Sequence, residues 1–341
     1  MSLSAAIRSQ SVRSADGVRL HTVRLGQSNR PVIVMVHGYP DTHQVWRPVA
    51  DQLAQHYDVV LYDVRGAGQS DRPARIADYV LPRLAEDLAA VVDALLPNQT
   101  FHLVAHDWGS IQSWESVTGE RLRGRIASYT SLSGPSLDHA AVWLRDHLRH
   151  PTWPKKRAAL KQLASSWYIA AFQLPLLAPL LWTTVLGKRW PRYLAQREGV
   201  SDAHPSRTQT ADGCTGVRLY RANFIPRLLK PNARPAHCPV QLIVPTQDAY
   251  VGAQLFSDLH RWVDRLYRRD IEASHWLPLS HPAVLAEWID QFVQGIESGQ
   301  MPDGLQACRV SDDAAPVSHC TTATRTSTAM PMVADLTTQG A

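Results

Sequence analysis

The segment TFHLVAHDWG, residues 100–109, joins an apolar run to a sharp turn, and the helical pattern SIQSWESV follows it directly. The apolar run predicts a buried strand. Ala105 and Gly109 stand two residues before and two residues after Asp107. Small residues are needed at both places where a strained strand-to-helix turn brings backbone close to backbone. The pattern predicts a nucleophile elbow with Asp107 at its tip, although an ordinary carboxylate at a helix N-terminus would fit the same local pattern.

Apolar runs of the same kind recur along the chain, at 31–38, 58–66 and 239–248. Unbroken β-branched runs are typical of strands that are buried on both faces of a parallel sheet. Helical patterns lie between these runs, at 46–57 and 81–96. Strands that alternate with helices predict an α/β fold with a mostly parallel central sheet.

The alternation is preceded by a hairpin signal and interrupted once. Residues 15–26 contain an Asp-Gly turn signal and predict a hairpin of two strands. Residues 137–232 have helical spacing and no strand-like run, so we expect an inserted helical cap. The core built around the sheet would then consist of residues 1–136 and 233–297. Residues 298–341 are rich in Thr, Ser and Ala without periodicity, and we expect them to be a disordered or loosely attached tail.

The composition is ordinary for a globular enzyme, with 45% hydrophobic and 19% charged residues among 341. The formal net charge is +5. The most concentrated basic residues are expected to form a solvated helix face, and they are Lys155, Lys156, Arg157 and Lys161. No basic stripe interleaved with aromatic residues is visible, so nucleic acid is not an expected partner.

The cysteines and the N-terminus indicate a compartment. The four cysteines have spacings that fit neither a zinc site nor a redox pair, which favours free thiols in a reducing compartment. Residues 1–14 lack the apolar centre of a secretory signal. We therefore expect a cytoplasmic protein without a metal site.

One segment raises the question of a membrane. Residues 168–187 carry no charge over a length that could cross a bilayer. Pro175 and Pro179 interrupt the segment, and polar side chains dilute it. We expect an apolar lid over a binding cavity rather than a transmembrane helix. A shallow contact of this lid with a membrane is left open.

An elbow nucleophile needs a histidine and an acid that follow it in the order nucleophile, acid, histidine. Asp248 comes directly after the strand-like run 239–245, and His275 follows the last strand-like segment. The other usual acid position, at residues 131–134, carries no carboxylate. We therefore predict a triad of Asp107, Asp248 and His275.

Two backbone N–H groups are expected to form the oxyanion hole. In elbow enzymes they belong to the residue after the nucleophile and to the loop after a neighbouring strand. These positions are Trp108 and Tyr39, the latter in the segment VHGYP. His37 and His106 flank the same region, and we expect them to support the site rather than to react.

An aspartate in the nucleophile position changes the chemistry. A carboxylate is ionised at neutral pH and can attack an sp³ carbon without a base. The product is an alkyl ester on Asp107. His275, held by Asp248, would then take a proton from water, which attacks the ester carbonyl carbon.

These motifs resemble the aspartate-nucleophile branch of the α/β-hydrolase superfamily, which contains epoxide hydrolases and haloalkane dehalogenases. The resemblance covers roughly residues 15–296 and implies an α/β-hydrolase fold with a helical cap. In the epoxide hydrolases, two cap tyrosines donate hydrogen bonds to the epoxide oxygen. The matching positions here are Tyr168, ahead of Phe172-Gln173-Leu174-Pro175, and Tyr220, in the segment Tyr-Arg-Ala-Asn.

The resemblance implies hydrolysis of a small hydrophobic epoxide by water to a vicinal diol, without cofactor. Haloalkane dehalogenation is the alternative, and it needs two N–H donors for the halide. Trp108 could be one donor, and Trp167 or Trp182 of the cap could be the other. A ligand-binding relative without catalysis is a third alternative, and the oligomeric state is left open.

Overall fold

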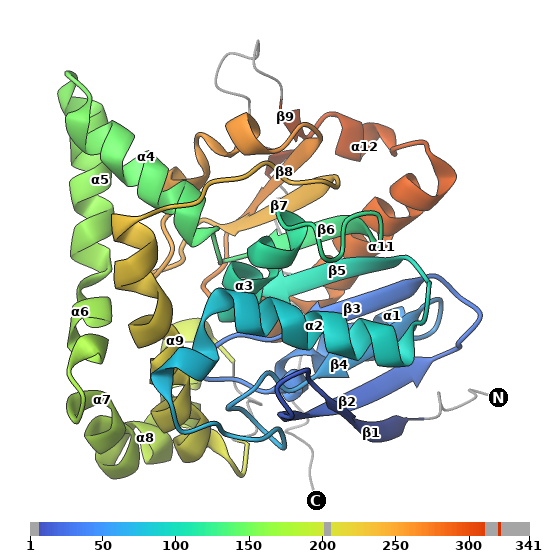
Figure 1. The fold of residues 1–341 in the computed structure, drawn as a ribbon. Helices are drawn as coiled ribbons and strands as arrows, with labels where there is room; N and C mark the ends of the chain where they lie inside the picture. The colour runs from blue at the N-terminus through green and yellow to red at the C-terminus, as the bar shows by residue number, and fades with distance from the viewer. Residues whose placement is uncertain (1–6, 201–205, 311–319, 322–341) are drawn as a thin grey trace, which may run out of the picture.

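A computed structural model describes residues 7–200, 206–310 and 320–321. Its centre is a ten-stranded sheet with the order β1-β2-β4-β3-β5-β6-β7-β8-β10, and β9 pairs with β8 (Figure 1). The pairs from β4 to β8, and β8 with β10, are parallel, whereas β2 runs antiparallel to both of its neighbours. The strands are β1 Arg8–Arg13, β2 Arg19–Gly26, β3 Val32–Val36, β4 Asp58–Tyr62, β5 Phe101–His106, β6 Ile126–Leu132, β7 Val240–Pro245, β8 Leu266–Ile271, β9 Arg309–Val310 and β10 Cys320–Thr321.

The predicted apolar runs form the centre of this sheet. Every residue of β3, β4, β5 and β7 is buried, as expected of strands that are covered on both faces. The predicted mostly parallel α/β fold is therefore confirmed. The hairpin was placed too late in the chain, because residues 15–26 contain only the turn and β2, and its first strand is β1. β1 has an exposed polar side chain at most positions, so it gave no apolar signal.

Side chains alternate between two cores on opposite faces of the sheet. Ile33 and Met35 pack into the core that α1 and α11 cover, whereas Val32, Val34 and Val36 pack into the core beneath α2 and α3. The helices outside the cap are η1 His43–Trp46, α1 Arg47–Leu53, η2 Ile76–Tyr79, α2 Leu81–Leu95, α3 Trp108–Val117, η4 Ala253–Phe256, η5 Leu259–Trp262, α10 Leu277–Ser280, α11 Pro282–Ser298 and α12 Asp303–Gln306.

A helical layer follows β6 and ends before β7, and it forms the left side of Figure 1. Its helices lie within the range 137–232 predicted for the cap; the exact domain boundaries stay a prediction. α9 lies between the outer helices and the sheet (Figure 1). The cap helices are α4 Leu137–Arg149, α5 Trp153–Ser165, α6 Trp167–Gln173, α7 Leu177–Leu181, the π-helical turn η3 Trp182–Leu186, α8 Gly187–Glu198 and α9 Gln209–Leu229.

Part of the expected tail is ordered. Residues 299–310 form α12 and β9, and β9 pairs antiparallel with β8. Leu305 and Cys308 are buried against Tyr267 and Phe292. The expectation of a disordered or loosely attached segment is therefore wrong for this stretch, whose few apolar residues are too short a pattern to recognise. Apart from the short strand β10, the remainder of the segment lies outside the described residues.

No single helix among the described residues has the length and apolar character needed to cross a membrane. One bent pair passes that test jointly, Trp167–Gln173 with Leu177–Glu198, at an angle of 101°. The pair covers the uncharged segment for which the sequence predicted a lid.

Candidate active site

Asp107 lies at the turn between β5 and α3, in the sharp conformation expected of an elbow. Its φ is 53° and its ψ is −125°, a strained region for a residue with a side chain. A Cβ at Gly109 would lie 2.2 Å from the carbonyl oxygen of Val36, so this position admits only glycine. The side chain of Asp107 makes no capping hydrogen bond with α3. Its Oδ1 instead accepts a hydrogen bond of 2.7 Å from the backbone N–H of Tyr39.

Three loops at the carboxyl ends of strands bring the predicted triad together. Asp248 follows β7 and His275 follows β8. His275 Nδ1 lies 2.8 Å from Oδ2 of Asp248, and His275 Nε2 lies 3.5 Å from Oδ2 of Asp107. The other oxygen of Asp248 accepts hydrogen bonds from the backbone N–H groups of Tyr250 and Val251. Asp248 is thereby held in place to orient the imidazole of His275.

The charges within the triad favour a protonated His275 beside an ionised Asp248. Burial lowers the pKa of His275, but the charge of Asp248 and the contacts with both carboxylates outweigh burial and place this pKa well above its usual value. Burial raises the pKa of Asp248, yet the charge and hydrogen bond of His275 bring it below its usual value. The protonated imidazole is therefore stabilised as long as both carboxylates are ionised.

The two flanking histidines make hydrogen bonds to the backbone near the triad. His37 Nε2 accepts a hydrogen bond from the backbone N–H of Val64, so its Nδ1 carries the proton and donates to the carbonyl of Gly38. His106 Nε2 lies 2.9 Å from the carbonyl oxygen of His275, and burial lowers the pKa of His106 to about 4. A neutral His106 that donates to this carbonyl fixes the loop that carries His275. Neither contact brings these histidines to Asp107 as reactive groups.

The two cap tyrosines lie above Asp107. Tyr168 comes from α6 and Tyr220 from α9, and their ring centroids are 6.1 Å apart. Tyr220 also packs edge-on against Trp108, at 4.8 Å. Burial and the negative charge of Asp107 raise the pKa of both phenols. Both side chains therefore stay protonated at neutral pH and can act as hydrogen-bond donors.

Asp107, Tyr168 and Tyr220 line two adjoining cavities. One cavity, of about 130 Å³, is bounded on its far side by the indoles of Trp182 and Trp190. The other, of about 400 Å³, lies between α4, α5, α6 and α9 and has a mainly aliphatic wall. Both cavities have mainly apolar walls, and residues of the segment 168–187 line each of them; a lid function of this segment stays a prediction.

Several residues at the site were not predicted from the sequence. Trp276 donates its indole N–H to Asp41 and its backbone N–H to Glu198 of α8. Burial raises the pKa of Asp41 to about 7. Tyr250 packs on the ring of His275 at 5.0 Å. Two of these residues could have been suspected from the sequence, because Asp41 directly follows HGYP and Tyr250 lies two residues after Asp248. No sequence signal pointed to Glu198.

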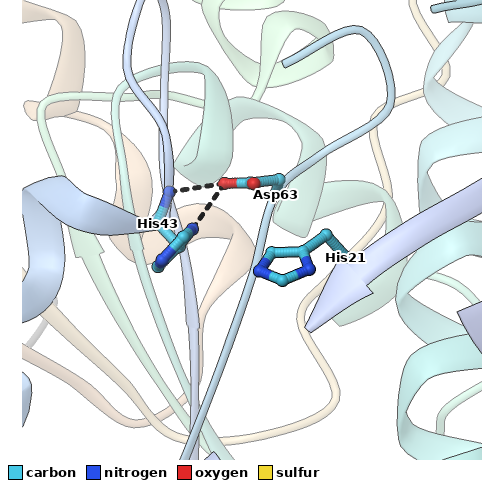
Figure 2. A group of neighbouring side chains, drawn as sticks. All are labelled: His21, His43 and Asp63. Carbon is cyan, nitrogen blue, oxygen red and sulfur yellow. Dashed lines mark hydrogen bonds and ion pairs between the residues drawn. The ribbon is translucent and has the colours of Figure 1, made fainter. Parts of the chain in front are cut away.

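A cluster of His21, His43 and Asp63 has the residue types and proximity of a metal site (Figure 2). Its atoms, however, already have protein partners. His43 Nδ1 and its backbone N–H both contact Oδ1 of Asp63, and Gln69 contacts Nε2 of His21. Asp63 Oδ2 accepts a hydrogen bond from the backbone of Gln69, and the pKa of Asp63 is lowered to about 2, since His43 outweighs the effect of burial. We interpret the cluster as a hydrogen-bond network that fixes the turn after β4.

Residues 31–282 match the family described as alpha/beta hydrolase fold. The chain belongs to the α/β-hydrolase family. This α/β hydrolase is 37% identical over 300 residues to a "Probable oxidoreductase EphD" of Mycobacterium tuberculosis, an alignment that covers 86% of this chain and 50% of that protein. It is 26% identical to "Epoxide hydrolase 3" of Xenopus tropicalis, over 82% of this chain and 75% of that one. The chain thus spans about half the length of the first of these curated relatives.

Solved structures agree on the fold of this α/β hydrolase. An epoxide hydrolase of Bacillus megaterium in complex with an inhibitor superposes with a TM-score of 0.69 at 21% identity, over 84% of this chain and all (100%) of that one. The epoxide hydrolase VrEH1 of Vigna radiata gives a TM-score of 0.66 at 23% identity, over 86% of this chain and 99% of that one. At these identities the likeness concerns the fold.

Proposed function

We propose that this α/β hydrolase opens hydrophobic epoxides to vicinal diols through an ester on Asp107. The single observation that carries the proposal is the placement of two phenols, the partly buried Tyr168 and the buried Tyr220, in the same cavities as a carboxylate at an elbow. A carboxylate attacks carbon, and two neutral donors can share the negative charge of an opening epoxide oxygen. The named epoxide hydrolases among the relatives and structural neighbours support the same activity.

In the first step, Oδ2 of Asp107 attacks a ring carbon, and the bond from that carbon to the epoxide oxygen breaks. Oδ1 is the less suitable nucleophile because the Tyr39 N–H holds one of its lone pairs. The released alkoxide takes a proton from one tyrosine, and the second tyrosine stabilises the resulting phenolate by a hydrogen bond. The product of this step is a hydroxyalkyl ester of Asp107.

In the second step, neutral His275 takes a proton from water, and the hydroxide attacks the carbonyl carbon of the ester. The negative charge develops on Oδ1, which already lies 2.7 Å from the N–H of Tyr39. Trp108 supplies the second donor, because as the first residue of α3 its N–H has no partner within the helix. Collapse expels the diol, whose alkoxide takes the proton from His275. The proton of the new Asp107 carboxyl group returns to the phenolate.

The cap also bears on dehalogenation. Of the two cap indoles that could complete a halide site, Trp182 donates its N–H to the hydroxyl of Tyr39 at 2.6 Å. Trp167 is 70% exposed. The Trp182 N–H is thus already paired and Trp167 lies mostly at the surface, so the two phenols favour an epoxide over a haloalkane. A ligand-binding protein would need no oriented pair of Asp248 and His275 behind the carboxylate.

A single turnover in heavy-oxygen water tests the ester. The enzyme, in excess over a hydrophobic epoxide such as styrene oxide, is digested and its peptides are weighed. The hydrolytic oxygen passes through Asp107, so label is expected in the Asp107 peptide and not in the Asp248 peptide. An active enzyme whose Asp107 peptide stays unlabelled would contradict the mechanism. Release of halide from a matched haloalkane, without turnover of epoxides, would favour the dehalogenase.

A further inference from the structure

Exposed large apolar side chains are concentrated on the cap. Among the described residues, all the exposed large hydrophobic side chains except Ile7 and Ile76 lie between Leu148 and Leu229. Leu176 is 80% exposed, Trp167 70% and Trp153 65%. Apolar patches of this extent are rare on a surface that faces only water, and they mark interaction sites.

The exposed side chains follow the outer helices. Trp153, Leu160, Trp167 and Leu174 recur every seven residues from the start of α5 to the end of α6. Leu176, just before α7, and Leu180, within α7, are also exposed, although they do not follow this spacing. Figure 1 shows α5, α6 and α7 one after another along the edge of the molecule that is remote from the sheet. We call these six side chains the cap surface.

The charges around the cap surface have one sign. Residues 147–197 contain no aspartate or glutamate, but they contain nine lysines and arginines. Lys155, Arg157 and Lys161 are exposed on α5, and Lys188 and Arg189 are exposed on α8. The basic helix face that was expected to be only solvated therefore lies beside exposed apolar side chains. Basic residues beside exposed Trp and Leu are typical of helices that lie in the interface of an anionic bilayer.

The larger cavity reaches the cap surface at Trp167. Leu163, Trp167, Ile225 and Leu228 are exposed, and they also line the cavity of about 400 Å³ that contains Asp107. A cavity with an apolar mouth on an apolar surface stays continuous with the acyl region of a lipid layer when that surface is inserted.

We propose that the cap surface inserts into one leaflet of an anionic lipid bilayer, with the basic residues of α5 and α8 against the headgroups. Charge selects this occupant, because a second copy of the chain would bring the same positive helices together. The bend of 101° between α6 and the helices after it keeps both parts shallow instead of crossing the bilayer. This proposal does not depend on the reaction at Asp107.

Flotation with vesicles tests the proposal. The probes are vesicles of phosphatidylcholine alone and of phosphatidylcholine mixed with phosphatidylglycerol. The chain is expected to float with the mixed vesicles and to lose binding as salt screens the headgroups. Leu176→Ser with Leu180→Ser should weaken binding by about tenfold or more, because each leucine loses its apolar burial. Lys155→Glu with Arg157→Glu should weaken binding to anionic vesicles by a similar factor of about ten or more.

The matched control substitutions lie outside the cap. Ile76→Ser removes an equally simple exposed apolar side chain, and Arg30→Glu reverses an exposed charge away from the cap. Both controls should float like the parent chain. Circular dichroism and thermal unfolding of every variant establish that it is folded. Absence of binding by the parent, or equal binding by folded Leu176/Leu180 variants, would overturn the proposal. A dimer in gel filtration that only the cap variants dissociate, without lipid binding, would assign the surface to self-association instead.

Discussion

His275 Nε2 lies 3.5 Å from Oδ2 of Asp107, a carboxylate that the proposed reaction converts to a neutral ester. The free enzyme and the ester therefore impose different fields on the same imidazole. In the free enzyme the charge of Asp107 is one of the causes that raise the pKa of His275. Once the ester forms, that contribution disappears and the pKa of His275 falls, so the imidazole can release its proton to solvent and then accept one from the attacking water.

The first prediction concerns this coupling. Asp107→Asn removes the charge but keeps the shape, so the pKa of His275 should fall relative to that of the parent chain. Titration of the His275 Cε1–H signal by NMR measures the shift. His260 of η5 lines neither cavity at Asp107 and provides an internal reference signal. An unchanged titration of His275 would mean that Asp107 and His275 do not interact.

The same coupling predicts a pH dependence of stability. The pKa of His275 is raised in the folded chain, so its contribution is fully present below the unfolded value, about 6.5. The contribution is lost as the pH rises through the higher folded value. The difference in unfolding free energy between the parent chain and Asp107→Asn should therefore shrink as the pH rises through that range. Urea unfolding at a series of pH values measures this difference.

The second prediction concerns the cap phenols. Tyr168→Phe and Tyr220→Phe should each lower kcat for an epoxide by about a hundredfold, the usual cost of losing one donor to a developing oxyanion. The double variant should lose turnover altogether. Tyr57→Phe is the matched control, because its hydroxyl donates to Asp290 and neither residue lines the cavities at Asp107. Full epoxide turnover by both single variants would remove the basis for assigning an epoxide substrate.

The third prediction concerns the space around the nucleophile. A Cβ at Gly38 would lie 2.3 Å from Oδ1 of Asp107, so Gly38→Ala must displace the carboxylate. We expect a loss of turnover of about a hundredfold or more, as small misplacements of reacting groups have this effect. Gly304→Ala, where a Cβ meets nothing within 4 Å, is the control. Pre-steady-state measurement of ester formation locates the defect in the first step; normal ester formation by Gly38→Ala would show that the loop can yield.

The fourth prediction concerns His106. His106→Phe leaves the carbonyl of His275 without its donor, which should cost about 1–3 kcal/mol of unfolding free energy. Because the loop that carries His275 is then less well fixed, hydrolysis of the ester should slow more than its formation. Chemical unfolding and accumulation of the ester in a rapid quench measure the two effects. If turnover and ester accumulation both matched the parent chain, His106 would have only a structural role.

The fifth prediction concerns metals. The nucleophile, the base and the proton donors of the proposed reaction are all side chains, so dialysis against a chelator should leave epoxide turnover unchanged. His43→Gln provides the complementary measurement, since it removes one member of the cluster with Asp63. That variant should lower stability by weakening the turn after β4, without altering the metal content found by atomic emission. A loss of turnover that added Zn²⁺ restores would contradict this interpretation.

Much of the site could be predicted because it follows local rules. The small residues on either side of Asp107 indicate a turn with close backbone contacts. Asp107, Asp248 and His275 each follow a strand-like run, so their order along the chain could be read from the ends of the strands. Glu198 and Tyr250 could not be predicted in the same way. Their contacts with Trp276 and His275 join separate segments of the chain, and no local pattern encodes such a meeting. β1 and the ordered residues 299–310 were missed because each contains too few apolar side chains to form a recognisable strand or helix pattern.

The sequence by itself determined the elbow, the strands buried on both faces and the presence of an aspartate at the tip of the elbow, because the first two depend on residue size and apolar period. Only the tertiary structure decided what Asp107 faces. The carboxylate makes no capping hydrogen bond with α3. One of its oxygens accepts a hydrogen bond from the N–H of Tyr39, and the other lies 3.5 Å from Nε2 of His275. The cap helices α6 and α9 place Tyr168 and Tyr220 in the same cavity. That outcome depends on packing between segments far apart in the chain, which residue patterns within one segment do not specify.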